Sequence, residues 1–373
     1  MIWTIFNLWL LKEKIMKINK IINNSIAIAG LMLISTSAIA GNGDRIGSAG
    51  ATELLINPWA RGISIGSSGV ASDIGLSSTY TNIAGLAFTP KTEIMFDRTN
   101  WLAGANINVN TAGLAQRISE TTVFSVAITS LSYGEIDITT VNQPEGGIGT
   151  FKPRANSFNV GLAHEFSQSI YAGFNLKVIS ESIANIKGNG VGFDFGIRYV
   201  TGEQDNIRFG IALKNVGPTM AYSGDGLASL IQYSETGELA SLEQRADAFE
   251  LPSLLNVGAA YDFNFTETDK LTLSGSFSAN SFSYDQLRIG ADYGKEIGNA
   301  AFHLMAGFVY EKGIFGKTYV VDGRATALSG LTAGLSVDAI VGESRNNLGI
   351  QYAYQAVNLF SGIHTIGLAI SLN

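Results

Sequence analysis

The feature that most constrains the fold is an alternation of apolar with small or polar side chains, which recurs from residue 91 to the C-terminus. In one such run, Val191, Phe193 and Phe195 alternate with Gly192 and Asp194. Successive side chains of a β-strand point to opposite faces, so each run places an apolar set on one face of a sheet. The other face is rich in Gly, Ala, Ser and Asn rather than Lys, Glu and Thr, which favours strands between lipid and a crowded lumen. On this parity, Phe195→Arg should disrupt the fold and Gly196→Ser should be tolerated.

The composition supports strands rather than helices as the membrane-facing elements. Of the 373 residues, 46% are hydrophobic and 15% are charged, yet no interior stretch reaches the ~18–20 consecutive apolar residues of a membrane helix. A soluble β-sandwich or β-solenoid is the alternative to a membrane barrel. The chain has no cysteine, which excludes a disulfide framework and a cysteine metal site. Its net charge of −7 gives no basic surface for nucleic acid.

The spacing of the strand-like runs predicts a closed barrel. About fourteen runs can be counted, and single-chain outer-membrane barrels have even strand numbers. The runs span approximately 91–99, 104–117, 121–134, 155–166, 169–183, 189–201, 206–215, 252–265, 270–282, 284–294, 298–310, 328–341, 346–357 and 361–372. Every second connection is short, and the long ones, about 135–154, 216–251 and 311–327, all fall in the other set, as expected for periplasmic turns and extracellular loops. We therefore predict an all-β, transmembrane antiparallel β-barrel of about 14 strands over residues 91–373, with both termini in the periplasm.

The N-terminal residues have the pattern of an export signal. Lys17 and Lys20 precede an apolar run over 26–34, which is followed by the small-residue sequence Ala38-Ile39-Ala40. A basic region, an apolar region and an A-x-A site together define a secretory signal peptide. We predict that residues 1–40 are removed, that the mature chain starts at Gly41, and that the protein is located in the bacterial outer membrane.

Residues 41–90 break the alternating pattern. They are rich in Gly, Ser and Ala and too polar to face lipid. Irregular backbone survives at membrane depth only inside protein or a water-filled cavity. We expect this segment to be an N-terminal hatch in the barrel lumen; a flexible periplasmic tail is the alternative.

Several motifs along the mature chain resemble one family of barrels. They are NPWAR (57–61), YTNIAGLA (80–87), KNVGP (214–218), LPSLLNVGAAY (251–261) and the last hairpin over 352–366. Together they are similar to the PorV/PorQ-type outer-membrane proteins of type IX secretion, which are related to FadL-type channels. The resemblance implies a fourteen-stranded barrel with an N-terminal hatch. It also implies a non-enzymatic protein that binds exported proteins and hands them to a secretion complex.

The alternative function is a FadL-like channel for a hydrophobic small molecule. The expected partners are therefore outer-membrane lipid together with exported proteins, secretion-complex subunits or a small hydrophobic solute. We expect no cofactor, no metal site and no nucleic-acid partner. The sequence GISIG at 62–66 matches the G-x-S-x-G pattern of hydrolases, but it lies in the hatch segment, and the three histidines of the chain are scattered over different strands.

Three groups of residues are candidates for function. The hatch or gating candidates are Arg61, Asp73, Asn82 and Gly85. Charged residues with lumen parity form either a structural salt-bridge network or a permeation path, since ionisable groups at bilayer depth must face the interior: Asp194, Arg198, Arg208, Lys214, Asp262, Arg288, Asp292 and Asp338. The long loop 216–251 should contain a short amphipathic helix that either caps the barrel or binds a partner through Leu227, Leu230, Ile231, Tyr233, Leu239 and Leu242.

Overall fold

The computed structural model describes residues 41, 43–232, 239–315, 326, 328–342, 346–357 and 360–372. The proposed signal peptide (1–40) and Tyr233 lie outside the described residues. Within the described part of the chain, no helix is long and apolar enough to cross a membrane.

The main body is a closed antiparallel barrel, which confirms the predicted fold class. Its strands are β1 (Thr92–Trp101), β2 (Ile107–Arg117), β3 (Thr122–Ser132), β6 (Arg154–Ser167), β7 (Ile170–Ile183), β8 (Ile186–Thr201), β9 (Ile207–Val216), β13 (Leu254–Asn264), β14 (Asp269–Asn280), β15 (Gln286–Ile297), β16 (Ala300–Glu311), β17 (Gly330–Val341), β18 (Asn346–Gln355) and β19 (Ile363–Leu372). Each strand pairs with its neighbours along the chain, and β1 pairs with β19 to close the ring. Closure leaves no unpaired strand edge, which a barrel in lipid requires.

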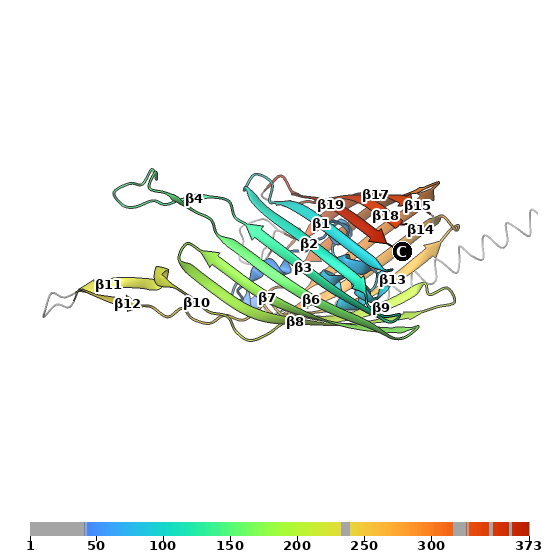
Figure 1. The fold of residues 1–373 in the computed structure, drawn as a ribbon, viewed down its shortest axis with the longest axis horizontal. Helices are drawn as coiled ribbons and strands as arrows, with labels where there is room; N and C mark the ends of the chain where they lie inside the picture. Colours follow the sequence, from blue (N-terminus) through green and yellow to red (C-terminus); the bar gives the residue numbers. More distant parts are fainter. Residues whose placement is uncertain are drawn as a thin grey trace, which may run out of the picture. The chain divides into compact units, whose positions relative to one another are not determined.

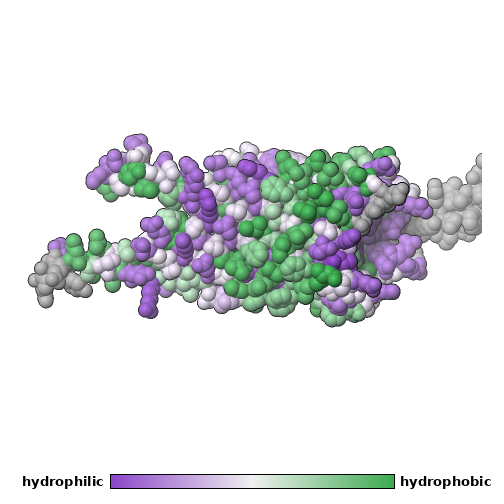
Figure 2. Space-filling model, viewed as in Figure 1, coloured by the Kyte–Doolittle hydropathy of each residue, from purple (hydrophilic) through white to green (hydrophobic). Residues whose placement is uncertain are grey.

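The alternation in the sequence divides the two faces of this wall as predicted. Along β8, Phe195 and Ile197 are 48% and 55% exposed, whereas Asp194 and Arg198 are 3% and 0% exposed. Apolar side chains gather in a belt over the barrel strands, with hydrophilic side chains toward both ends (Figure 2). An outward apolar belt and a polar interior are the arrangement of an outer-membrane barrel.

The two ends of the barrel differ in their connections. At one end, here called the short-turn end, the strands are joined by short turns such as Ser167–Ile170 between β6 and β7. The other end, the long-loop end, carries two small hairpins that extend beyond the strands (Figure 1). These are β4 (Ile136–Asp137) with β5 (Thr150–Phe151), and β11 (Ala228–Gln232) with β12 (Leu239–Glu243). A further short strand, β10 (Tyr222–Ser223), pairs with β8, and η6 (Asp225–Leu227) precedes β11.

The second hairpin corrects the amphipathic helix expected in loop 216–251. Leu230 lies opposite Ser241 on one face of the hairpin, and Ile231 lies opposite Ala240 on the other. The apolar residues of this loop therefore divide between two faces instead of forming the single stripe that a helix needs.

The segment before β1 forms short helical turns joined by irregular backbone. They are η2 (Gly43–Arg45), η3 (Thr52–Leu55), α2 (Ala60–Ser64), η4 (Gly75–Ser77), α3 (Ser78–Thr81) and η5 (Ile83–Phe88). This segment, the hatch, contacts the inward face of strands all around the barrel (Figure 1). It begins at the long-loop end, where Gly41 contacts Asp285, and it reaches β1 at the short-turn end.

This path corrects the expectation that both termini lie at the short-turn end. That expectation counted only strands, and it holds for the start of β1 and the end of β19. The hatch itself passes through the barrel, so residue 41 lies at the opposite end from Thr92.

The hatch is seated on glycines of the inner wall. A Cβ atom on Gly210 would lie 2.4 Å from the carbonyl oxygen of Val70, and one on Gly307 would lie 2.3 Å from the carbonyl carbon of Ile65. Nine glycines of the described wall lie against hatch atoms, backbone at some positions and side chains at others, and we call them the glycine collar: Gly113, Gly161, Gly173, Gly196, Gly210, Gly258, Gly290, Gly307 and Gly334. The small inward residues of the alternation thus provide the space that the hatch occupies.

Candidate functional site

Among the cavities between hatch and wall, two lie toward opposite ends of the barrel and are separated by the hatch. The long-loop cavity, of about 90 Å³, is lined by hatch residues including Ile63 and by β15 residues including Arg288. The short-turn cavity, of about 360 Å³, is lined by Arg61 and by residues near the ends of β1 and β19 such as Glu93. Arg61 and Ile63 both belong to α2, so this one helix borders both cavities.

Polar side chains of the wall bind the helical turns of the hatch at their backbone. The Asp97 carboxylate accepts a hydrogen bond from the backbone N–H of Ala60, the first residue of α2, at 2.7 Å. Thr332 donates to the carbonyl oxygen of Ser64 at the other end of α2, at 3.0 Å. The Glu93 carboxylate accepts from the N–H of Leu76 at 2.7 Å. These contacts satisfy donors and acceptors that short helices leave open at their ends.

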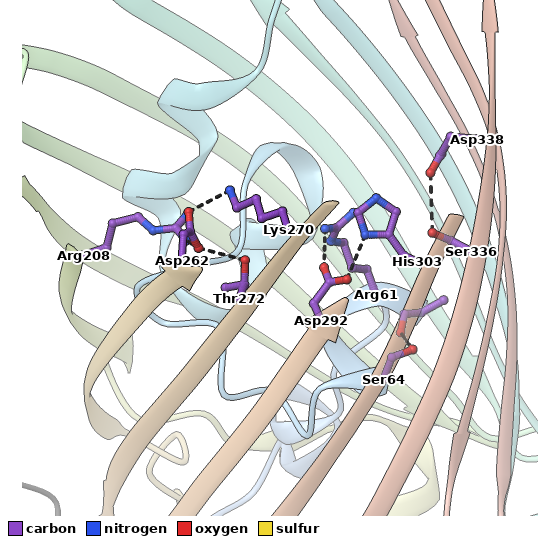
Figure 3. A network of polar contacts seen from close by, with 11 residues as sticks. Arg61, Ser64, Arg208, Asp262, Lys270, Thr272, Asp292, His303, Ser336 and Asp338 are labelled. Carbon is purple, nitrogen blue, oxygen red and sulfur yellow. Dashed lines mark hydrogen bonds and ion pairs between the residues drawn. The ribbon is translucent and has the colours of Figure 1, made fainter. Parts of the chain in front are cut away.

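Arg61 holds α2 to strand β15 of the barrel wall. Its guanidinium donates to the Asp292 carboxylate on β15 at 2.6 Å, and the ring of His303 on β16 contacts the other oxygen of Asp292 at 2.8 Å (Figure 3). The side chains of Arg61 and Asp292 are 27% and 13% exposed. The charge of Asp292 raises the pKa of Arg61. The hatch candidate Arg61 and the lumenal candidate Asp292 are therefore partners.

Arg198 of the barrel wall contacts residues in the second half of the hatch. It is fully buried and donates to the carbonyl oxygen of Asp73 at 2.5 Å. A Cβ atom on Gly85 would lie 2.7 Å from the same guanidinium. Asn82 caps η5 by accepting from the N–H of Ala84, and its amide donates to the carbonyl oxygens of Val70 and Ile197.

Asp73 itself lies within this packed region. Its carboxylate accepts from the hydroxyl of Thr81 at 2.9 Å. Burial raises the pKa of Asp73 to about 6. The candidates Asp73, Asn82 and Gly85 are thus brought together beside Arg198, in the packed part of the hatch.

The long-loop cavity combines apolar side chains with two cations. Lys214 is 2% exposed, and its ammonium lies 3.6 Å from the centre of the Tyr80 ring. Arg288 donates to Gln286 at 2.6 Å. Among the described residues, no Asp or Glu lines this cavity, and neither cation forms an ion pair. Neutral polar side chains such as Asn256 and Gln355 also line it. The apolar lining includes Ile63, Leu254, Val309, Leu328 and Trp101.

The short-turn cavity has the opposite balance of charge. Three carboxylates line it, those of Glu93, Glu296 and Asp338. Arg61 and His303 also line it, and both contact Asp292.

The remaining lumenal candidates form ion pairs within the wall. Lys177 donates to Asp194 and to Asn215, each at 2.6 Å, which joins β7, β8 and β9. Arg208 pairs with Asp262, which also binds Lys270 at 2.7 Å (Figure 3). These residues are structural contacts of the barrel, whereas Lys214, Arg288 and Asp338 face the cavities.

Two other sequence candidates lie elsewhere. Ser64 of the G-x-S-x-G motif is buried, and its hydroxyl donates to the carbonyl oxygen of Ala60 within α2. Among the described residues, no group of three or more His, Asp or Glu residues could hold a metal ion. The loop candidates that the structure describes lie on or beside the β11–β12 hairpin, apart from both cavities, and Leu230 and Leu239 are 75% and 69% exposed.

Sequence reasoning missed Asp97 and Glu93 as hatch contacts. Both alternate with the outward Ile94 and Phe96, so the parity rule applied to the run 91–99 would have placed them inside. It also missed Tyr80, whose contact with Lys214 depends on a path of the hatch that no periodicity describes.

Comparisons with known proteins place the fold. No family model and no curated protein sequence matches the chain. Its structure resembles a ΔS2S3 mutant of the TodX monoaromatic hydrocarbon channel, with 12% identity, 84% of this chain and 97% of that chain covered, and a TM-score of 0.53. It also resembles the Pseudomonas putida toluene transporter TodX, with 11% identity, 85% and 98% coverage, and a TM-score of 0.53.

At this identity the likeness shows the fold alone. The part of the predicted relation to FadL-type channels that this likeness bears out is the fold, an outer-membrane type of barrel similar to that of these hydrocarbon channels. None of these comparisons supports a role in type IX secretion.

Proposed function

We propose that this protein is an outer-membrane channel for a small molecule with an apolar body and an anionic head. In this proposal the solute enters the long-loop cavity and reaches the short-turn end when the hatch shifts. The observation that carries the proposal is the lining of the long-loop cavity, where Lys214 and Arg288 lie among apolar and neutral polar side chains, with no carboxylate among the described lining residues. A buried cation that no carboxylate contacts directly is costly, and a bound anion relieves that cost.

The fold likeness supports transport rather than catalysis. The similar solved structures are described as a hydrocarbon channel and a toluene transporter, which favours a hydrophobic small molecule over an exported protein as the partner. Because two cations line the cavity of this chain, we expect the hydrophobic solute to carry an acidic group as well. Ligand sites of this kind combine an apolar lining with a few convergent polar groups.

Protein binding of the PorV type is the second candidate. It rests on the exposed Leu230 and Leu239 of the β11–β12 hairpin, which extends from the long-loop end (Figure 1). Exposed apolar side chains on such a hairpin are suited to contact with another protein.

The proposed solute class is tested with a matched pair of probes, benzoate and toluene, which differ in the carboxylate. Binding to the purified barrel is measured for the original chain, Lys214→Met and Arg288→Met. We expect each substitution to weaken benzoate binding by about tenfold or more, because a charge-assisted hydrogen bond contributes ~1.5–3 kcal/mol. Toluene has no carboxylate for these cations to bind, so its binding should change by less than about twofold.

Lys187→Met is the matched control, because Lys187 is exposed on β8 near the long-loop end and lines neither cavity. It should leave both probes unaffected. Equal losses for benzoate and toluene, or benzoate binding that is indifferent to both cavity substitutions, would contradict the proposed solute class.

A further inference from the structure

The first residue of the hatch is bound to a carboxylate at the long-loop end. The backbone nitrogen of Gly41 donates to Asp285 Oδ2 at 2.8 Å, in the connection between β14 and β15. The site is close-fitting: a Cβ atom on Gly41 would lie 2.8 Å from the backbone nitrogen of Asp285 and 2.9 Å from the carbonyl oxygen of Ser283. Only glycine fits at this position without displacing the loop.

Residues 45 and 49 of the hatch also contact residues at the long-loop end. Arg45 pairs with Glu250 at 2.6 Å, and its guanidinium lies 4.1 Å from the centre of the Phe282 ring. Ala49 forms a parallel bridge with Glu250. Gly41, Arg45 and Ala49 are therefore all docked at the long-loop end, where Asp285 binds Gly41.

The sequence places the predicted signal-peptidase site directly before this residue, after Ala38-Ile39-Ala40. Cleavage there adds one water across the Ala40–Gly41 amide: the C–N bond breaks, Ala40 becomes a carboxylate, and the Gly41 nitrogen becomes an amine that takes up a proton. We propose that the resulting α-ammonium of Gly41 binds Asp285 as an ion pair and thereby locks the start of the hatch onto the outer loops.

The chemistry of the two states explains why cleavage matters. Before cleavage the Gly41 nitrogen is a neutral amide with one N–H; afterwards it carries a full charge and three N–H donors. Hydrogen bonds between two ionised groups are about twice as strong as neutral ones. Other charged side chains described in this region are Asp44 and Arg45 of η2, Glu250, which pairs with Arg45, and Lys312, which lies 5.3 Å from the centre of the Tyr284 ring. Export processing would thus complete the seating of the hatch above the long-loop cavity.

The proposed ion pair between the Gly41 ammonium and Asp285 is tested by the reactivity of the N-terminal amine. Mature protein, whose N-terminus is first established by mass spectrometry, is treated at pH 7.5 with a limiting amine-acylating reagent, and labelling of the N-terminal peptide is followed over time. A carboxylate partner keeps an α-amine protonated and unreactive, since it raises the pKa from its usual ~8 by one unit or more. We expect Asp285→Asn to label about tenfold faster or more than the original chain.

Two further variants keep the test independent of misfolding. Asp225→Asn removes an exposed carboxylate from the neighbouring long loop and should label at the original rate. A serine inserted between Ala40 and Gly41 moves the ammonium away from Asp285 and should label as fast as Asp285→Asn. Each variant is scored only after its barrel is shown to be folded by the heat-dependent shift of its band in gel electrophoresis.

The proposed ion pair would be overturned by a mature chain that starts at another residue. It would also be overturned by a folded Asp285→Asn barrel that labels at the original rate. The inference depends on the proposed cleavage after Ala40 but not on the proposed solute. Failure of benzoate binding would leave the labelling result unchanged, so the two proposals can fail separately.

Discussion

The two cavities are bounded by the same wall and the same hatch, yet their charges are opposite. Lys214 and Arg288 line the long-loop cavity with no carboxylate among its described lining residues, whereas Glu93, Glu296 and Asp338 line the short-turn cavity. The barrel wall itself carries both signs along its length. What separates them is the hatch, and above all α2, which borders one cavity with Ile63 and the other with Arg61.

The contrast assigns different roles to the two spaces. Cations among apolar side chains suit capture of an amphiphilic anion, while a vestibule rich in carboxylates favours its release. For the channel proposed above, this difference implies a direction of passage from the long-loop end to the short-turn end. The opposite charges of the two cavities can act on a solute in turn only if the hatch keeps the cavities apart.

The largest effect is expected from breaking the contact that separates the cavities. Arg61→Ala leaves Asp292 with His303 as its remaining partner, and removing one member of a buried pair costs ~3–5 kcal/mol. Because Arg61 is 27% exposed, we expect a smaller loss of hatch stability, about 2–3 kcal/mol. Hydrogen exchange of residues 60–67 measures it directly.

Arg154→Ala is the control for Arg61→Ala, because Arg154 is exposed at the long-loop end of β6. In Arg154→Ala, hydrogen exchange of residues 60–67 should be unaltered. If Arg61→Ala also leaves exchange in this segment unchanged, the ion pair does not hold the hatch.

A smaller effect, dependent on pH, is expected at the outer part of the hatch. Burial, together with the neighbouring Glu181, raises the pKa of Glu53 from 4.5 to about 8. Tyr222, which donates to Glu181, and Tyr133 also face this pair. A docked segment that holds a proton more tightly than the undocked one loses stability as pH rises from 4.5 toward 8.

We therefore expect hydrogen exchange of residues 52–59 to become faster between pH 5 and pH 8, after correction for intrinsic rates, by an amount on the order of 1 kcal/mol. Glu53→Gln should abolish this dependence and protect the segment at pH 8. Glu203→Gln, which changes an exposed carboxylate in a short turn, is the control. A pH dependence that persists in Glu53→Gln would assign it to another group.

The smallest effect on transport is expected from the β11–β12 hairpin. Replacing residues 226–247 by a short Gly-Ser linker keeps the bridges Met220–Phe249 and Ala49–Glu250, so the barrel and hatch should remain folded. Benzoate uptake into proteoliposomes should stay within about twofold of the original. A tenfold loss of uptake would contradict the separation of hairpin and cavity, and loss of exported-protein attachment in cells would favour PorV-type binding.

The barrel could be predicted from the sequence because lipid imposes a period of two on every strand. Phe195 and Arg198 point as their parity requires, and the alternation of loop lengths gives the two ends. Parity assigns a residue to a face, but it does not name a neighbour. It placed Asp292 inside the barrel without showing that Arg61 of the hatch is its partner.

The interior of the barrel follows rules that the alternation does not contain. Gly196→Ser was expected to be tolerated, yet a Cβ atom there would lie 2.1 Å from Asn82 Oδ1, so the substitution should displace the hatch. The hatch has no period because its backbone follows the glycine collar rather than a ladder of its own. In loop 216–251, apolar residues on both faces of a hairpin were taken for one stripe of a helix.

The central claim, that passage requires the hatch to move, can be tested by fixing the hatch to the wall. The hydroxyl oxygens of Ser68 in the hatch and Ser274 on β14 are 2.6 Å apart, and the chain has no cysteine of its own. The double variant Ser68→Cys, Ser274→Cys can therefore form a disulfide, whose S–S bond is ~2.05 Å long. Benzoate uptake into proteoliposomes is then compared for the oxidised and reduced protein, with each single variant as the control. The account predicts that oxidation of the double variant lowers uptake by about tenfold or more and that reduction restores it. Equal uptake by the oxidised and reduced double variant would contradict it.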